Sequence, residues 1–251
     1  VRNKLDAKNF EDFLKAHPSG HFADRARRLK EALKPVQVAK VSPPKWKVPY
    51  LAKPTVGIYP KRYKPGDTFK DCPECPEMVV ISAIPKAIAV GKFEVTQAEW
   101  RIIIGWNPSQ FGGGRNPVEN VRFDDVQDYL GILRAETGKK YRLLSEDEWE
   151  FAARAGTKTV YQCGNDVGCL GNVGWYYGNS GGRTHPVGSK EANAFGLHDM
   201  HGNVWEWVKS RVLRGGSWTN KPEDLGPYAR NAGTFDGRGQ PYVGGFRIAR
   251  D

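Results

Sequence analysis

The chain has 251 residues, 39% of them hydrophobic and eight of them tryptophan, which is enough apolar material for one large domain with a core. No apolar run approaches the roughly 20 residues that a membrane-spanning helix needs, and no signal-peptide pattern opens the sequence, which favours the cytoplasm. The net charge is +10, but residues 35–70 hold eight Lys and Arg against a single acid, so much of the excess is local. No aromatic and basic module accompanies this strip, so we expect no specific nucleic-acid partner.

The N-terminal third predicts two segments. Apolar residues at helical spacing over 7–16 and 21–33, separated by Pro18-Ser19-Gly20, predict a helical hairpin within residues 1–34. One hairpin cannot bury its own apolar face, so it either docks on the main domain or continues a repeat, and a fused or docked effector domain is an expected N-terminal partner. Residues 35–70 carry many Pro and Lys and predict an extended linker, with a docking strip for an acidic partner as the alternative.

The four cysteines form two close pairs, Cys72 with Cys75 and Cys163 with Cys169. Three alternatives stay open. The pairs can together hold zinc, although the second spacing is looser than in usual structural sites. They can form two local disulfides, or they can be free thiols, as is usual in a reducing compartment.

The main domain is predicted over residues 71–251. Residues 78–84 and 86–95 are rich in β-branched and aliphatic residues and predict strands. Thr96 with Glu99 and Ser145 with Glu148 each form a capping box that starts a helix, and a third helix over 123–137 ends at Gly138. Little regular structure is expected beyond residue 156.

Five motifs in this domain follow one another in a recognisable order. They are GKFEVTQAEW (91–100), YRLLSEDEWEFAARAG (141–156), GLHDMHGNVWEW (196–207), RGGSW (214–218) and GFRIAR (245–250). Together they resemble the formylglycine-generating-enzyme (sulfatase-modifying factor) family over residues 76–251. The resemblance implies an α+β, C-type-lectin-like fold that is rich in loops. Two connections, 81–86 and 207–214, are shorter than in that family.

The resemblance also bears on catalysis. Catalytic members use a cysteine pair downstream of RGGS to bind copper, since soft sulfur ligands select cuprous ion. Residues 215–251 contain no cysteine. A second branch takes iron from an H-x3-H-x-E helix, but here His17 and His21 are separated by a helix breaker. We therefore expect no enzyme of either type, with neither copper nor iron, and hydrogen-bonding roles for His198 and His201.

One metal signal remains in DMHGNVWEW. Hard oxygen ligands suit calcium, and the matching family positions hold a structural calcium ion. The predicted ligands are the Asp199 and Glu206 carboxylates and the Gly202 and Val204 carbonyl oxygens. The alternative is that Asp199 and Glu206 only accept hydrogen bonds from loop amides.

The segment 219–243 has few aliphatic residues and several aromatic ones among Gly, Asn and Thr, a composition typical of adaptable binding loops. Its frame resembles the variable proteins of diversity-generating retroelements, a subset of the family. The expected exposed binding residues are Thr219, Asn220, Lys221, Gly226, Tyr228, Asn231, Ala232, Phe235, Gly237, Gly239, Gln240 and Tyr242.

The residues flanking and bracing this segment are expected to be structural. Trp205, Trp207 and Trp218 are predicted as core, while Arg230, Asp236 and Arg238 are predicted to brace the segment by salt bridges.

The leading hypothesis is a non-catalytic protein that binds a protein or other macromolecular ligand at this C-terminal surface. The alternatives are a redox or protein-maturation enzyme with an unrecognised site, and a regulatory module fused to an effector.

Overall fold

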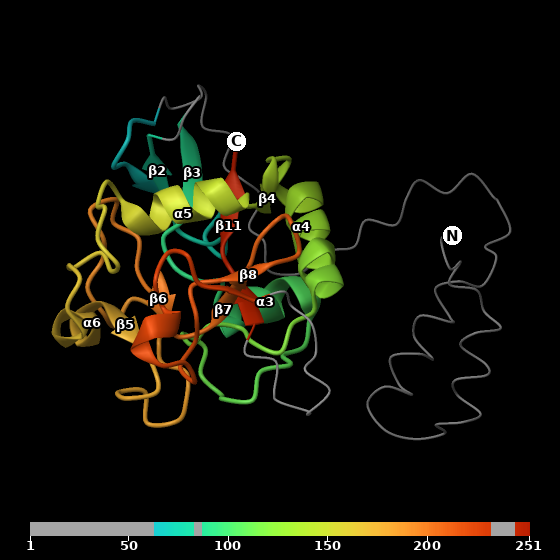
Figure 1. Ribbon diagram of the computed structural model, residues 1–251. Helices are drawn as coiled ribbons and strands as arrows, with labels where there is room; N and C mark the ends of the chain where they lie inside the picture. The colour runs from blue at the N-terminus through green and yellow to red at the C-terminus, as the bar shows by residue number, and fades with distance from the viewer. Residues whose placement is uncertain (1–62, 83–86, 232–243) are drawn as a thin grey trace, which may run out of the picture. The chain divides into compact units, whose positions relative to one another are not determined.

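A computed structural model describes residues 63–82, 87–231 and 244–251 (Figure 1). The chain divides into two compact units, Val1–Val48 and Pro49–Asp251, and all described residues lie in the second. The expected hairpin and most of the expected linker therefore lie outside the described residues. Residues 63–70 do not continue the linker, because strand β1 (Thr68–Phe69) pairs with the next strand and the Tyr63 ring stacks on Phe69.

A five-stranded antiparallel sheet forms one half of the domain. Its order is β1, β2 (Met78–Ile81), β3 (Ile88–Gly91), β11 (Ile248–Arg250) and β4 (Tyr141–Leu143). Strands β2 and β3 confirm the two predicted strands within shorter bounds. Strand β11 pairs with both β3 and β4, so the strand of this sheet that comes last in sequence lies in its interior.

Three predicted helices are confirmed. Helix α3 (Gln97–Ile104) starts at the Thr96 capping box, and α5 (Glu146–Arg154) starts at the Ser145 capping box. Helix α4 (Phe123–Thr137) ends at Gly138, whose φ of 67° is the left-handed conformation that glycine adopts freely. A fourth helix, α6 (Val167–Val173), was not predicted; the Asp166 side chain caps it by accepting from Gly168 N–H.

The loop-rich half is organised by very short strands. The second sheet has the order β10 (Gly244–Phe246), β7 (Trp205–Trp207), β8 (Leu213–Arg214) and β9 (Arg230–Asn231). Strands β5 (Gly174–Trp175) and β6 (His201–Gly202) pair separately, and the 3₁₀ turn η1 covers Pro222–Asp224. The short connection after Trp207 closes a tight hairpin, in which Val208 N–H donates to the Val212 carbonyl.

The core lies on both faces of the five-stranded sheet. Alternate strand residues enter one cluster with α3 and α4, where Trp100 stacks on Tyr129 at 5.5 Å. The other residues of the same strands meet α5, which lies across the opposite face (Figure 1). Trp205 and Trp207 are buried, as predicted, whereas Trp218 is only half-buried.

Both cysteine pairs are disulfides, Cys72–Cys75 and Cys163–Cys169, so the local-disulfide alternative describes this structure. Within the described ranges, no helix is both long and apolar enough to cross a bilayer.

Candidate functional site

The predicted calcium motif is part of a buried charge network. Glu206 and Arg247, 1% and 0% exposed, form an ion pair of 2.8 Å. The Glu206 carboxylate also accepts from Trp149 Nε1 at 2.6 Å. Arg247, which lies between β10 and β11, donates further to the carbonyls of Gly91 in β3 and His198, so its guanidinium joins these parts of the chain.

Two more carboxylates are buried beside this pair. Asp199 accepts from Gly188 N–H through Oδ2, while its Oδ1 is shut from solvent and has no partner among the described residues. Glu94 accepts from the Asn203 side chain and from Val204 N–H. Burial first, and neighbouring carboxylates next, raise the pKa of Glu94 well above its usual value. Burial likewise raises the pKa of Asp199.

These residues fit calcium in part. Asp199 Oδ1 is an unsatisfied hard oxygen, and three buried carboxylates face one guanidinium, so a cation would offset excess negative charge. Both Glu206 oxygens already accept hydrogen bonds from Arg247. The hydrogen-bonding alternative expected such bonds, but with loop amides as the donors. In the part of the chain that the structure describes, no three His, Cys, Asp or Glu side chains are grouped to hold a metal. Calcium therefore stays a prediction that needs Glu206 to share its oxygens.

The two histidines of this motif have hydrogen-bonding roles. His201 is buried; its Nδ1 lies 2.8 Å from the Leu225 carbonyl, and its Nε2 accepts from Gln162 N–H. Burial lowers the pKa of His201, which favours the neutral ring. His198 Nδ1 lies 2.8 Å from the Lys190 carbonyl.

The start of the expected binding segment has a buried base. Ser217 is buried, and its N–H and Oγ both donate to Asn220 Oδ1. Asn220 is half-buried rather than exposed as expected, because its side chain turns back to accept these bonds and helps to fix the turn. The expectation that Gly226 is exposed is wrong: it is buried, and a Cβ there would lie 3.6 Å from the Val160 side chain.

Beyond this base the segment reaches solvent. Tyr228 is 75% exposed, and Thr219, Lys221 and Asn231 are exposed as expected. The six remaining expected residues, Ala232, Phe235, Gly237, Gly239, Gln240 and Tyr242, lie outside the described residues, as do the predicted braces Asp236 and Arg238.

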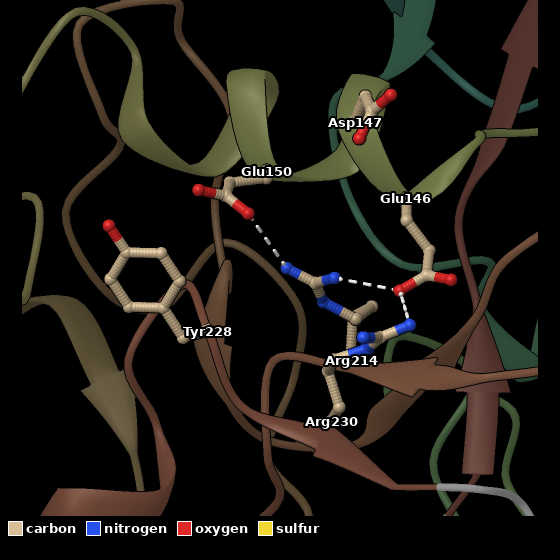
Figure 2. Close-up of a pocket in the computed structure, with 6 residues that line it drawn as sticks. All are labelled: Glu146, Asp147, Glu150, Arg214, Tyr228 and Arg230. Carbon is tan, nitrogen blue, oxygen red and sulfur yellow. Dashed lines mark hydrogen bonds and ion pairs between the residues drawn. The ribbon is translucent and has the colours of Figure 1, made fainter.

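Tyr228 stands at the edge of a charged hollow of about 290 Å³ (Figure 2). Helix α5 contributes Glu146, Asp147 and Glu150, and the segment and its β8 anchor contribute Arg214, Tyr228 and Arg230. This hollow could not be predicted from the sequence, because α5 lies about 70 positions away from the segment.

Ion pairs join the two sides of the hollow. Buried Arg214 bridges Glu146 at 3.1 Å and Glu150 at 3.3 Å, and exposed Arg230 reaches Glu146 at 2.6 Å (Figure 2). A Ser210 hydrogen bond and the two arginines lower the pKa of Glu146. Arg154 lies over the Tyr228 ring at 4.6 Å. The predicted brace by Arg230 is confirmed, and α5 is the element it holds.

Comparison with known proteins agrees with this architecture. The family model for the sulfatase-modifying factor enzyme 1-like domain matches residues 69–251. Chaperone protein LppX of Paenibacillus barcinonensis is 29% identical, over 64% of this chain and 79% of its own length. Inactive C-alpha-formylglycine-generating enzyme 2 of Bos taurus is 37% identical, over 41% of this chain and 38% of its own length. Other matches are proteins named formylglycine-generating enzyme and hercynine oxygenase.

Among solved structures, Treponema denticola variable protein 1 is similar, with a TM-score of 0.65 and 25% identity. The superposition covers 73% of this chain and 98% of that protein.

Proposed function

The chain belongs to the sulfatase-modifying factor enzyme 1-like domain family, and on this premise we propose that it is a non-catalytic protein that binds a macromolecular partner through its C-terminal surface. The observation that carries the proposal is the contrast within residues 214–231. Arg214 and Ser217 are buried and bonded at the base, while Tyr228 is 75% exposed and faces solvent at the edge of the hollow.

A surface of this kind separates stability from recognition. The ion pairs of Arg214 and the turn at Ser217 hold the base of the segment, so exposed side chains above it can differ without loss of the fold. Tyr228 offers a large, rigid contact area at low entropic cost, which is how aromatic side chains act in adaptable binding surfaces. Diversification of this segment by a retroelement is part of the proposal, and the similarity to a variable protein supports it.

The sequence supports the absence of the family's copper chemistry. No cysteine follows Arg214, and the structure places all four cysteines in the two local disulfides. The family also contains members named as inactive.

Replacement of Tyr228, Phe235 and Tyr242 together by Ser tests the binding surface. The immobilised wild-type chain and the triple variant are compared for captured proteins and glycans, each then confirmed with the purified partner. Loss of a confirmed partner with an unchanged melting temperature is the expected result. Tyr177→Ser is the matched control, because Tyr177 is 73% exposed outside the segment. Unfolding of the triple variant would show the aromatics to be core and would overturn the proposal.

The alternative, a maturation enzyme, is favoured by the relatives named as enzymes and has its own test. The chain is incubated with copper, oxygen and a cysteine-containing sulfatase peptide, and aldehyde is measured with a hydrazine reagent. We expect no aldehyde above the peptide alone. Aldehyde that forms with turnover would replace the binding proposal by the enzymatic one.

A further inference from the structure

The loop Cys-Pro-Glu-Cys between β1 and β2 has no part in the proposed binding surface. Its two ends are joined by the Cys72–Cys75 disulfide, with Cα atoms 5.0 Å apart, and Cys75 N–H donates to the Cys72 carbonyl at 3.1 Å. Cys75 is 1% exposed and belongs to the core cluster, whereas Cys72 is only partly buried at its margin. The pair therefore has one more accessible and one sequestered cysteine.

This asymmetry favours thiol–disulfide exchange at one defined sulfur. An incoming thiolate must reach one sulfur, and the other sulfur must leave and stay near enough to return. Cys72 suits the first role because it is the more exposed residue. Cys75 suits the second because the surrounding core shields it from a competing attack.

The loop also holds a carboxylate without a full set of partners. Glu74 lies between the two cysteines in sequence, and its Oε2 is shut from solvent with no hydrogen-bond partner within the described ranges. Glu74 lines a hollow of about 460 Å³ that also includes Lys70, Phe93, Ile102 and Arg115. Glu77 and Glu99 also line it, so its walls carry apolar, cationic and anionic side chains, and a hollow of this size can accept a short peptide segment.

The sheet does not depend on the disulfide for its register. Met78 to Ile81 pair residue by residue with β3, and Gly66 N–H donates to the Val80 carbonyl across the loop. A disulfide that closes so short a loop removes less chain entropy than one closing a long loop. The Cys72–Cys75 disulfide therefore stabilises the fold less than a disulfide between distant residues would, and a purely structural role explains it poorly.

We propose that Cys72–Cys75 is a thiol–disulfide exchange site for a dithiol peptide or protein held against the Glu74 hollow. The substrate thiolate attacks Cys72 Sγ, the Cys72–Cys75 bond breaks, and Cys75 leaves as a thiolate. The second substrate thiolate then attacks the substrate sulfur that is bonded to Cys72, and Cys72 leaves as a thiolate. The substrate loses two electrons and becomes a disulfide, the chain gains two electrons and becomes a dithiol, and the two substrate protons pass to the cysteines. Glu74 is the carboxylate that accepts the first of these protons.

The test uses the full chain with both disulfides formed and a Cys-x2-Cys peptide as substrate. After alkylation, mass spectrometry is expected to find one peptide disulfide per chain and alkylated Cys72 and Cys75. A chain with Cys163→Ser and Cys169→Ser is the control and should react at the wild-type rate. Resistance of Cys72–Cys75 to the peptide, with reduction confined to Cys163–Cys169, would overturn the proposal.

Single variants test the assigned roles. In Cys75→Ser, Cys72 should form a mixed disulfide with glutathione disulfide at least tenfold faster than Cys75 does in Cys72→Ser. Equal rates in two variants with wild-type melting curves would refute the asymmetry. Glu74→Gln should slow exchange severalfold near neutral pH but not above pH 9, where the attacking thiol is already ionised; a pH-independent effect would refute the proton-accepting role. This site goes beyond the binding function, and its failure would leave that function untouched.

Discussion

Replacement of Arg247 by Met tests how much the buried charge network of Arg247, Glu206, Glu94 and Asp199 contributes to stability. The side chain is 0% exposed and donates to Glu206, to the Gly91 carbonyl and to the His198 carbonyl. Removing one partner of a buried ion pair costs about 3–5 kcal/mol, because the remaining charge is left without compensation. Arg247 also favours the charged forms of the buried Glu94 and Asp199 side chains beside it. We expect Arg247→Met to lose at least about 3 kcal/mol of unfolding free energy at pH 7.

The loss should also depend on pH in a definite direction. Burial raises the folded-state pKa of Glu94 and Asp199, and the charge of Arg247 lowers both. Without Arg247 these pKa values rise further above those of the unfolded chain. A group with a raised folded-state pKa contributes stability that is lost as pH rises through that pKa, so the deficit of the variant should grow as pH rises above the unfolded-state carboxyl pKa values of about 4.

Urea unfolding followed by tryptophan fluorescence, with a chelator present throughout, measures both quantities. Arg211→Met is the matched control, because the Arg211–Asp124 pair is 67% and 72% exposed and such pairs contribute about 0–1 kcal/mol. A deficit for Arg247→Met as small as that of the control, or one that does not change with pH, would refute the electrostatic reasoning.

Three further predictions concern stability. A chelator should lower the melting temperature of the wild-type chain by a few degrees, because bound calcium at Asp199 stabilises the folded state. An unchanged melting curve, with no calcium found by metal analysis, would refute the calcium site. Glu206→Ala should lower the free energy of unfolding by about 3–5 kcal/mol with or without calcium, because it leaves Arg247 unpaired. Trp207→Ala should lose about 3–5 kcal/mol in urea unfolding, whereas half-buried Trp218→Ala should lose about 1–3 kcal/mol, and equal losses would contradict the difference in burial. Gly202→Ala should lower the free energy of unfolding by at least about 2 kcal/mol, because φ at Gly202 is +89° and a Cβ would lie 2.0 Å from the Trp175 carbonyl oxygen. Gly105→Ala is the control: φ at Gly105 is +85° but the space around it is open, so the free energy of unfolding should fall by only about 1 kcal/mol.

The helix starts could be predicted from the sequence, because they depend on contacts between residues close together in the chain. The Thr96 and Ser145 capping boxes need only residues three positions apart, and both are formed. Helix α6 was missed because its sequence, VGCLGNV, has two glycines and too few apolar positions to show a period. Leu170 and Val173 instead pack with Tyr161 and Leu225, which the sequence alone does not bring together.

In the candidate site, too, local features could be predicted from the sequence and features that depend on distant contacts could not. The exposure of Tyr228 follows from local composition, and the structure agrees. The role of Glu94 could not be predicted, because its hydrogen bond to Asn203 spans 109 positions. The hollow beside Tyr228 likewise depends on α5, and the burial of Gly226 depends on contact with Val160.

The central position of β11 has a consequence for synthesis of the chain. Among the strands of this sheet, Ile248–Arg250 is synthesised last, yet it fills the gap between β3 and β4, which precede it by about 100 residues or more. A ribosome-bound chain that lacks these three residues has two separated sheet fragments with unpaired edges, which are prone to pair with other chains. Such late, long-range closure also predicts slow folding. A nascent chain of this protein therefore stays open to chaperones and to aggregation until β11 has left the exit tunnel.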